Sequence, residues 1–236
     1  MFGRRKLFEG LALVPIAGAL SCTTNQKKVA TSGTAALPSP GAAPPLARGG
    51  FAPVLSGREM MRTRFFPNIE LVTSKGEKVK FYDDLLKDKI VILNMMYAHC
   101  NGICPTTTAN LKKVRQILRD EINHDIYVYS ITVKPEEDSS ADLAEYAKMH
   151  DIDDPQWLFL TGKPHEIDLL RHNIGFADPN PEVDRDKARH SGMLRYGNEP
   201  LSIWGSCQGS AEPAWIAKEI GFAVPRQFKR HPAVNE

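Results

Sequence analysis

An apolar run at residues 90–97 limits what this chain can fold into more than any other feature of its sequence. The run has the length of a strand and only Asn94 interrupts it, so it predicts a strand that is covered on both faces. After Pro105, apolar residues recur at helical spacing as far as Ile122, and proline is favoured in the first turn of a helix. We therefore predict a helix at residues 105–120, directly after a buried strand, as in α/β proteins.

The segments around this unit alternate between strand and helix patterns. A hairpin is expected at residues 69–81, with Gly76 in the turn between two strand-like segments. Further strands are predicted at residues 126–133 and 157–160, a second hairpin at 193–204, and helices at 141–150, 165–173 and 212–220. This order predicts an α/β fold of the thioredoxin-like kind, in which a central mixed sheet is flanked by helices and preceded by an extra N-terminal hairpin.

Composition and charge exclude several classes of protein. Of the 236 residues, 42% are apolar and 25% are charged, which argues against a wholly disordered chain and against a multi-span membrane protein. The 30 basic and 28 acidic residues give a net charge of +2, without the basic excess expected of a nucleic-acid-binding protein. Four cysteines are too few for a disulfide scaffold.

Residues 1–22 have the pattern of an export signal. Arg4 and Arg5 begin a pattern similar to a twin-arginine leader, and the apolar run that follows is shorter than the ~20 residues of a membrane-spanning helix. The residues before Cys22 also fit a lipoprotein cleavage box, although Ala19 stands where leucine is usual. We expect an exported protein on the periplasmic or extracytoplasmic side of the membrane, with lipidation of Cys22 or an uncleaved N-terminal anchor as alternatives.

The remainder of the chain divides into three parts by composition. Residues 23–60 are rich in Ala, Pro, Gly, Ser and Thr and cannot bury enough apolar surface to fold, so we expect a disordered tether. Residues 61–225 carry the periodic pattern of the folded domain, and residues 226–236 form a basic tail. A tether beside an export signal predicts that the domain is held close to a membrane.

Cys100 and Cys104 lie at the turn between the buried strand and the helix that follows it. At such a turn, unpaired backbone N–H groups and the helix dipole favour the thiolate form of a cysteine. Soft thiolates select copper(I), zinc or iron–sulfur clusters, and two of them with one further ligand suffice for copper(I). The alternatives are a structural disulfide or two core thiols, which are less favoured because we expect this turn to be exposed.

The sequence around the two cysteines resembles the Sco/SenC family of copper proteins, and the similarity extends over residues 65–222. In family order, the matching segments are residues 92–106, Ser130-Ile131-Thr132-Val133, Pro135-Glu136-Glu137-Asp138, Ala144-Glu145-Tyr146-Ala147, Trp157-Leu158-Phe159-Leu160-Thr161-Gly162 and His190-Ser191. A Cys-x-x-x-Cys-Pro turn with a His-Ser pair about 85 residues later is a specific combination.

The resemblance implies a thioredoxin-like fold that binds copper through Cys100, Cys104 and His190. Such a set of two thiolates and one imidazole suits trigonal copper(I), and an added ligand would accommodate copper(II). Without the resemblance, His190 would count as a surface histidine in a charged loop.

The resemblance also implies a metallochaperone, not an enzyme, that delivers copper to the dinuclear copper centre of a respiratory oxidase, usually cytochrome c oxidase. Its expected partners are the copper-accepting oxidase subunit and a thiol reductant. The alternative is a thiol–disulfide oxidoreductase, in which the redox-active dithiol of Cys100 and Cys104 reduces the cysteine ligands of the acceptor. A peroxiredoxin-like peroxidase is a more distant alternative, and the copper centre of nitrous oxide reductase is another conceivable acceptor.

Other potential ligands are assigned different roles. His99 directly precedes Cys100 and should point to the opposite face of the strand, so we expect it near the site or in solvent and keep it as a reserve ligand. Met95 and Met96 are soft donors, but methionine in a buried strand usually serves packing. The remaining histidines are expected to be ordinary surface residues: His124, His150, His165, His172 and His231.

Three positions depart from the family pattern. Residues 101–103 are Asn-Gly-Ile where the family usually has Pro-Asp-x, which gives a more flexible loop with one charge fewer. Lys134 stands where the family typically has aspartate. Cys207 follows the second predicted hairpin, where no cysteine is expected, and could be a buried bystander, a resolving thiol or an extra metal ligand.

Overall fold

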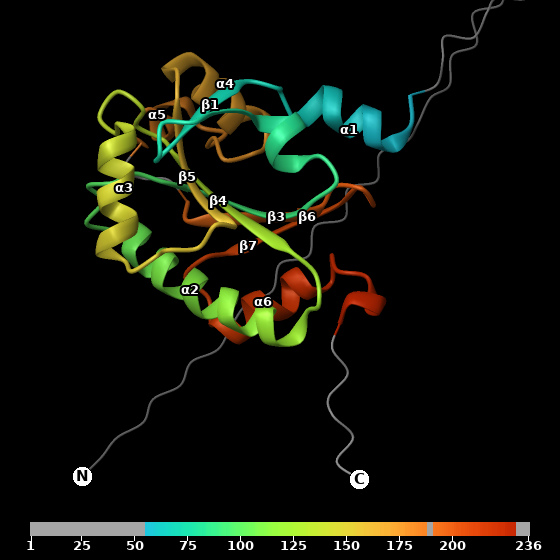
Figure 1. The fold of residues 1–236 in the computed structure, drawn as a ribbon. Coiled ribbons are helices and arrows are strands. Elements are labelled where there is room, and N and C mark those ends of the chain that lie inside the picture. Colours follow the sequence, from blue (N-terminus) through green and yellow to red (C-terminus); the bar gives the residue numbers. More distant parts are fainter. Residues whose placement is uncertain (1–54, 188–190, 230–236) are drawn as a thin grey trace, which may run out of the picture. The chain divides into compact units, whose positions relative to one another are not determined.

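The computed structural model describes residues 55–187 and 191–229, and these form a mixed α/β domain (Figure 1). Its described strands make one seven-stranded sheet in the order β2-β1-β5-β4-β3-β6-β7. Their bounds are β1 Glu70–Thr73, β2 Lys78–Lys80, β3 Ile90–Met96, β4 Ile126–Thr132, β5 Trp157–Gly162, β6 Met193–Asn198 and β7 Ile203–Gln208. The three central strands β3, β4 and β5 run parallel, and the strands at both edges pair antiparallel.

Strand β3 lies inside the sheet, as the apolar run predicted. It pairs in parallel with β4 from Ile90↔Ile126 to Met96↔Thr132, and antiparallel with β6 from Ile90↔Asn198. Every residue of β3 is buried, because both faces of the sheet are covered by helices. The one polar residue, Asn94, donates to the hydroxyl of Ser130 on β4 over 3.0 Å, so its amide is not left unpaired in the core.

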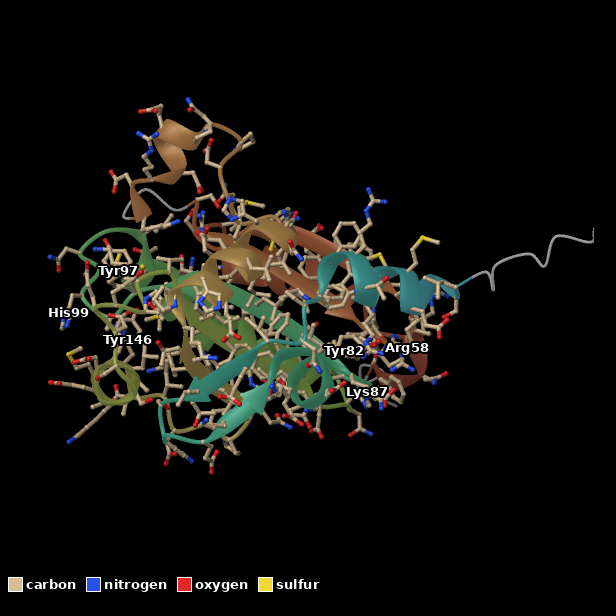
Figure 2. All side chains as sticks on the ribbon, turned by 90° about the horizontal axis from the view of Figure 1, so that it is seen from above. Arg58, Tyr82, Lys87, Tyr97, His99 and Tyr146 are labelled. Carbon is tan, nitrogen blue, oxygen red and sulfur yellow. The ribbon has the colours of Figure 1, made fainter. Side chains whose placement is uncertain are left out.

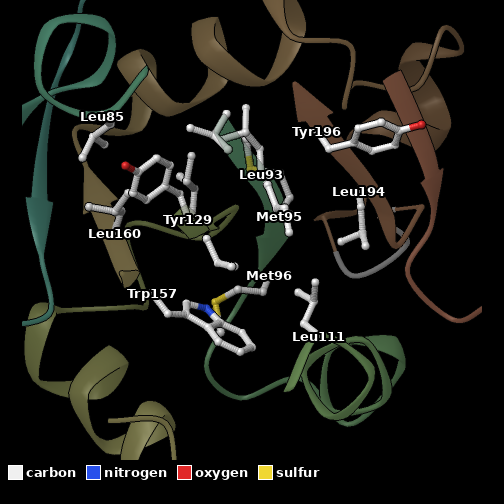
Figure 3. Packing of buried hydrophobic residues seen from close by; sticks show 14 of the residues in the cluster. Leu85, Leu93, Met95, Met96, Leu111, Tyr129, Trp157, Leu160, Leu194 and Tyr196 are labelled. Atoms are coloured by element: carbon white, nitrogen blue, oxygen red, sulfur yellow. The ribbon is translucent and has the colours of Figure 1, made fainter. Parts of the chain in front are cut away.

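Helices cover both faces of the sheet (Figure 1). One face carries α2 (Ile103–Glu121), α3 (Ser140–Met149) and α6 (Pro213–Gly221), and the other carries α1 (Gly57–Phe65) and α4 (Pro164–Asn173). Figure 3 shows the resulting core, in which Leu111 of α2 lies on the same side of the sheet as Met96, and Tyr129 and Leu160 lie on the other. The predicted central mixed sheet, its flanking helices and the N-terminal hairpin of β1 and β2 are all confirmed.

Several local boundaries differ from the sequence-based expectation. Helix α2 begins at Ile103 instead of Pro105, so Cys104 lies within its first turn, where proline is tolerated because the N–H groups have no intrahelical partner. The second hairpin was predicted to end near Trp204, which is wrong, because β7 continues to Gln208. Cys207 is therefore a strand residue opposite Leu194 of β6.

Three short helical segments have no counterpart in the prediction. They are a π-helical turn at Phe81–Leu86, helix α5 at Pro181–Asp184 and a 3-10 turn at Arg226–Phe228. None of these segments is long enough to show a helical repeat of apolar residues in the sequence. Within the described part of the chain, no helix is both long and apolar enough to cross a membrane.

Helix α1 begins at Gly57, so its first turn falls within the segment that the sequence predicts as tether. A capping box stabilises this start, since the Ser56 hydroxyl accepts from the Glu59 N–H and the Glu59 carboxylate accepts from the Ser56 N–H. Arg58 then binds the buried carboxylate of Glu199, in the β6–β7 turn, through two hydrogen bonds of 2.6 Å. The chain is thus fixed to the domain from its first described helix onward.

Candidate metal centre

The two cysteines of the predicted site lie on either side of one short turn. Cys100 follows the end of β3, and its N–H donates to the carbonyl of Tyr97 over 3.3 Å. Cys104 lies in the first turn of α2, with Gly102 at the N-cap. The turn is exposed at Asn101 and Gly102, as expected, but the cysteines on either side of it are buried, with relative exposures of 6% for Cys100 and 2% for Cys104.

A buried carboxylate draws this turn into the protein. Asp138 follows β4, is 1% exposed, and accepts the Ala98 N–H over 3.0 Å and the Thr132 hydroxyl. The carboxylate thereby holds the backbone two residues before Cys100. Its second oxygen, Oδ1, has no hydrogen-bond partner. Because the chain lies against this carboxylate, the cysteines sit beneath the surface instead of projecting from it.

The two sulfurs are neighbours, and they are chemically unequal. Burial disfavours ionisation of Cys100, but hydrogen bonds from the Cys104 thiol, from the N–H groups of Cys104 and Gly102, and from the Tyr97 hydroxyl outweigh burial and lower its pKa. The Gly102 N–H lies 3.4 Å from Cys100 Sγ. Burial and the thiol–sulfur hydrogen bond with Cys100 raise the pKa of Cys104 well above its ordinary value. When one proton leaves the pair, the charge therefore resides on Cys100.

Tyr97 completes the surroundings of Cys100. The hydrogen bond to Cys100, followed by burial, raises the pKa of the Tyr97 hydroxyl to about 12, so this hydroxyl is protonated and can donate at neutral pH. The ammonium of Lys134, which follows β4, lies 4.6 Å from the centre of the Tyr97 ring. Lys134 also pairs with Glu137 at 3.1 Å. The residue that departs from the family pattern therefore places a positive charge on the ring of Tyr97, where it is paired with Glu137.

The other soft or nitrogen donors near the turn are placed as the sequence predicted. Met95 and Met96 are buried core residues, 3% and 0% exposed. His99 is exposed and lies at the edge of the molecule (Figure 2). Its charge contributes a minor part of the lowered pKa of Asp142, whose main cause is hydrogen bonding to Ser139, and this places His99 towards the start of α3.

The remaining histidines within the described ranges form no metal-holding cluster with cysteines or acidic residues. Two of them pack on aromatic rings at 4.3 Å between ring centres: His124 on Phe228 and His150 on Tyr146. His165 is exposed, and His172 lies at the surface beside Asp168. His231, the last of the predicted surface histidines, lies outside the described residues.

The third predicted ligand, His190, also lies outside the described residues, which resume at Ser191. The segment before it is held by ion pairs. Buried Arg171 of α4 binds Asp184 with both terminal nitrogens, one of them at 2.6 Å, and the same carboxylate accepts the Asp178 N–H at 2.7 Å. Further along, Asp186 is close enough to raise the pKa of Tyr97 slightly, after larger effects of Cys100 and burial. This loop therefore returns towards the cysteine turn before it reaches His190.

Cys207 is separate from this site. It is 4% exposed and lies in β7 opposite Leu194. Burial, with a smaller effect of Glu219 of α6, raises the pKa of its thiol to about 11. Among the described residues, no three His, Cys, Asp or Glu side chains converge to hold a metal ion, and Cys207 therefore joins no such cluster with the dithiol. These surroundings agree with the bystander hypothesis for Cys207.

Comparison with known proteins places this arrangement in a family. The family model described as SCO1/SenC matches residues 58–219, well over half of the chain. The chain belongs to the SCO1/SenC family.

Curated SCO1/SenC relatives align over part of their length. A SCO1 protein homolog of Bacillus subtilis is 31% identical over 77 residues, which cover 33% of this chain and 39% of the relative. A SCO2-like protein of Rickettsia prowazekii is 32% identical over 117 residues, or 49% of this chain and 54% of the relative. The chain thus spans about two fifths to about half the length of these curated relatives.

Solved structures of Sco proteins share the fold. A SCO1/SenC family lipoprotein from Bacillus anthracis superposes with a TM-score of 0.55 at 18% identity, over 66% of this chain and 93% of that one. ScoI of Arabidopsis thaliana with copper bound superposes with a TM-score of 0.54 at 21% sequence identity, over 68% of this chain and 97% of that one. BsSco is described as a Sco-family cytochrome c oxidase assembly protein with a disulfide switch. It superposes with a TM-score of 0.54 at 23% sequence identity, over 66% of this chain and 90% of that one. The thioredoxin-like fold of the prediction is confirmed.

Two residues of the site were missed by sequence reasoning. Tyr97 lies three positions before Cys100 and contacts it. The sequence signal that could have identified Tyr97 is its position directly after the strand that leads into the turn. In the sequence, Asp138 stood out only as the last residue of a segment that matches the family pattern. Its role depends on the parallel pairing of β3 and β4, which ends at Met96↔Thr132 and brings the chains after both strands together.

Proposed function

We propose that this SCO1/SenC protein binds copper through the sulfurs of Cys100 and Cys104, with His190 as the third ligand. The observation that carries the proposal is the hydrogen-bonded pair of sulfurs at the start of α2, one of them poised as a thiolate. Two adjacent soft donors suit copper(I), for which low coordination numbers are common. Family membership and the copper-bound structure of the Arabidopsis relative support the same metal.

Copper is the cargo of this protein in our proposal, not a catalytic cofactor. The chain would act as a metallochaperone that passes copper(I), by stepwise exchange of ligands, to the dinuclear copper centre of cytochrome c oxidase. The description of BsSco as a cytochrome c oxidase assembly protein supports this type of acceptor. The burial of both cysteines beneath an exposed turn also suits a carrier, because it would limit the contact of a bound copper(I) ion with solvent.

We further propose that the protein acts outside the cytoplasm. The leader at residues 1–22 and the tether that follows it, up to the start of α1, would hold the domain close to a membrane, and a lipoprotein in the same family supports such an anchor. Tethering raises the effective concentration of the domain near a membrane-bound acceptor without any new contact between the two proteins.

A second candidate function follows from the inequality of the two thiols. A lowered pKa on Cys100 and a raised one on Cys104 are what a thiol–disulfide oxidoreductase requires, since the first attacks as thiolate and the second resolves the mixed disulfide. In this role the protein would reduce the cysteine ligands of the acceptor before copper is delivered. The disulfide switch described for BsSco supports this chemistry.

Copper(I) competition against a chelator of known affinity tests the first function. The fully reduced, full-length protein is compared with Cys100→Ser, Cys104→Ser and His190→Ala, and with Cys207→Ser as a matched control. We expect one tightly held copper in the parent and in Cys207→Ser, its loss in the two site cysteine variants, and weaker binding in His190→Ala. Tight copper in both Cys100→Ser and Cys104→Ser would disprove the site.

Thiol–disulfide exchange distinguishes the two functions. Reduction of a disulfide peptide should survive in His190→Ala, because exchange needs only the dithiol, and should disappear in Cys100→Ser. If His190→Ala lost both copper binding and exchange, the histidine would be a structural residue. If the reduced parent held no copper but exchanged disulfides rapidly, the oxidoreductase would be the correct assignment.

A further inference from the structure

An apolar groove lies between α1, the end of α4 and the sheet, on the face that both helices cover (Figure 1). Its volume is about 250 Å³, and its walls include Met61 and Phe65 of α1, Ile174 after α4, and Trp204 of β7. Among the described residues that line it, the one charged side chain is Arg195 of β6. The volume is somewhat below the ~300–1,000 Å³ of pockets for drug-sized ligands, so the groove suits a smaller body such as one aromatic ring.

The floor of the groove is preformed. The indole of Trp204 lies over the backbone of Gly197, its direct partner on β6, because a Cβ on that glycine would collide with the ring. The Phe66 ring packs on the same indole, with 4.4 Å between the ring centres. These contacts fix the orientation of Trp204, so a ligand that enters the groove meets a surface that is already ordered, which lowers the cost of binding.

Arg195 has hydrogen-bonding capacity that the described part of the protein does not use. Four described arginines are buried or half-buried, and three of them bind carboxylates: Arg58, Arg115 and Arg171. Arg195 instead donates to the Gly175 carbonyl over 2.8 Å and lies 5.9 Å from the centre of the Phe176 ring. Its Nε–H is buried without a hydrogen-bond partner. A half-buried guanidinium without a counter-charge costs free energy, so the groove favours an anion.

We propose that this groove is a binding site for a small monocarboxylate with an apolar body, of the arylalkanoate class. The apolar body lies against the Trp204 indole and α1, and the carboxylate pairs with the Arg195 guanidinium, whose fork matches two carboxylate oxygens. One positive charge favours a singly charged head group over a phosphate dianion, which would leave a negative charge unpaired in apolar surroundings. The inference is independent of the copper site, because no residue of the groove belongs to the candidate metal centre.

Calorimetric titration of the full-length protein tests the site, with 3-phenylpropionate as the probe and the neutral, isosteric 3-phenylpropanamide as its control. Both compounds are titrated into the parent, into Arg195→Gln and into Arg226→Gln, which changes an exposed arginine outside the groove. We expect the parent to bind one acid per chain with a Kd of about 1 mM or below, and the amide at least about ten-fold more weakly.

Arg195→Gln should weaken binding of the acid to the level of the amide and leave the amide unchanged, because only the acid carries the charge that the guanidinium recognises. Arg226→Gln should change neither affinity by more than about two-fold. No saturable binding of the acid by the parent, equal affinities for acid and amide, or equal losses in the two arginine variants would overturn the inference.

Two further variants locate the bound probe. Of the three tryptophans, Trp157 is buried and Trp215 lies on α6, so Trp204 is the one that lines the groove. The acid should change the fluorescence of the parent and not that of Trp204→Phe. Met61→Glu places a like charge in the groove and should abolish binding of the acid, and it decides the matter if Arg195→Gln does not fold. A fluorescence change that persists in Trp204→Phe, or undiminished binding in Met61→Glu, would disprove the site.

Discussion

The thiol of Cys104 donates a hydrogen bond to the sulfur of Cys100, so one cysteine of the pair carries the charge and the other supplies a proton. Both sulfurs are buried, yet only Cys100 has enough donors around it to become a thiolate. This inequality arises at the junction of β3 and α2, where the backbone N–H groups of the first helical turn face the preceding residue. Two properties of the protein that can be measured without copper depend on this inequality or on the contacts that hold the turn.

Alkylation should distinguish the three described thiols. In the reduced protein at pH 7.5, iodoacetamide should modify Cys100 first, because the thiolate is the reactive form and its pKa is lowered. Cys104, with a strongly raised pKa, and Cys207, with a pKa of about 11, should react at least about ten-fold more slowly. Peptide mapping against time gives the order, and faster modification of Cys207 than of Cys100 would contradict the assigned surroundings.

The buried carboxylate of Asp138 should control the order of the cysteine turn. Asp138→Ala removes the acceptor of the Ala98 N–H and should cost about 1–3 kcal/mol of stability. Hydrogen exchange should accelerate at Ala98 and at the Cys100 N–H, more than in the rest of β3. Glu136→Ala, in the same loop but exposed, serves as control and should leave both exchange and stability unchanged within about 0.5 kcal/mol.

The ion pair of Arg171 and Asp184 should make the loop before His190 sensitive to acid. The Arg171 guanidinium holds the pKa of Asp184 well below its ordinary value, which means that the folded state favours the charged carboxylate. Its contribution is fully present above the ordinary carboxyl pKa of about 4 and is lost as the pH falls through the lower value of the folded state. Asp184→Asn should therefore lower stability by about 3 kcal/mol at pH 7, or about 6–12 °C in Tm.

The difference in Tm between the parent and Asp184→Asn should narrow steadily as the pH falls below about 4. Asp151→Asn is the control, since its carboxylate is 92% exposed and lies 3.9 Å from Lys112. That substitution should change Tm by less than about 2 °C at any of these pH values. A constant difference between parent and Asp184→Asn from pH 7 to pH 2.5 would show that the charge of Asp184 does not stabilise the loop.

Glu199 should anchor the first helix to the sheet. Its carboxylate is 3% exposed and accepts hydrogen bonds from Arg58, the Tyr82 hydroxyl and the Asp88 N–H. Glu199→Gln should destabilise the domain by about 2 kcal/mol in urea unfolding, because charge-assisted bonds become neutral ones. In contrast, Glu70→Gln removes a surface pair with Lys78 and should cost no more than about 0.5 kcal/mol. Equal losses in the two variants would argue against an anchoring role.

The sequence was sufficient to predict the elements whose patterns are long and regular. The apolar run of β3 and the helical repeat of α2 indicate their structures directly, and their junction located the cysteines. The extent of β7 was not predictable in the same way. Its residues 204–208 combine large, small and polar side chains, and the strand extends that far because β6 offers it a pairing edge.

The details of the site depended on contacts between distant segments. The backbone before the cysteine turn is bound by Asp138, which lies 40 positions from the N–H it accepts, and no local sequence pattern marks such a pair. Lys134 was recognised as a departure from the family, but its position over the Tyr97 ring follows from where β4 ends beside β3. The two cysteines of the candidate site were thus visible in the sequence, whereas their electrostatic inequality required the three-dimensional structure.

Arg58 and Tyr97 lie at opposite ends of the domain (Figure 2). Arg58 fixes the first described helix to the β6–β7 turn, whereas Tyr97 adjoins the sulfurs. The polypeptide that precedes α1 therefore joins the domain at the end remote from the dithiol. If that leading segment anchors the domain to a membrane, as proposed above, its length would set how far the sulfurs reach without changing any contact around them.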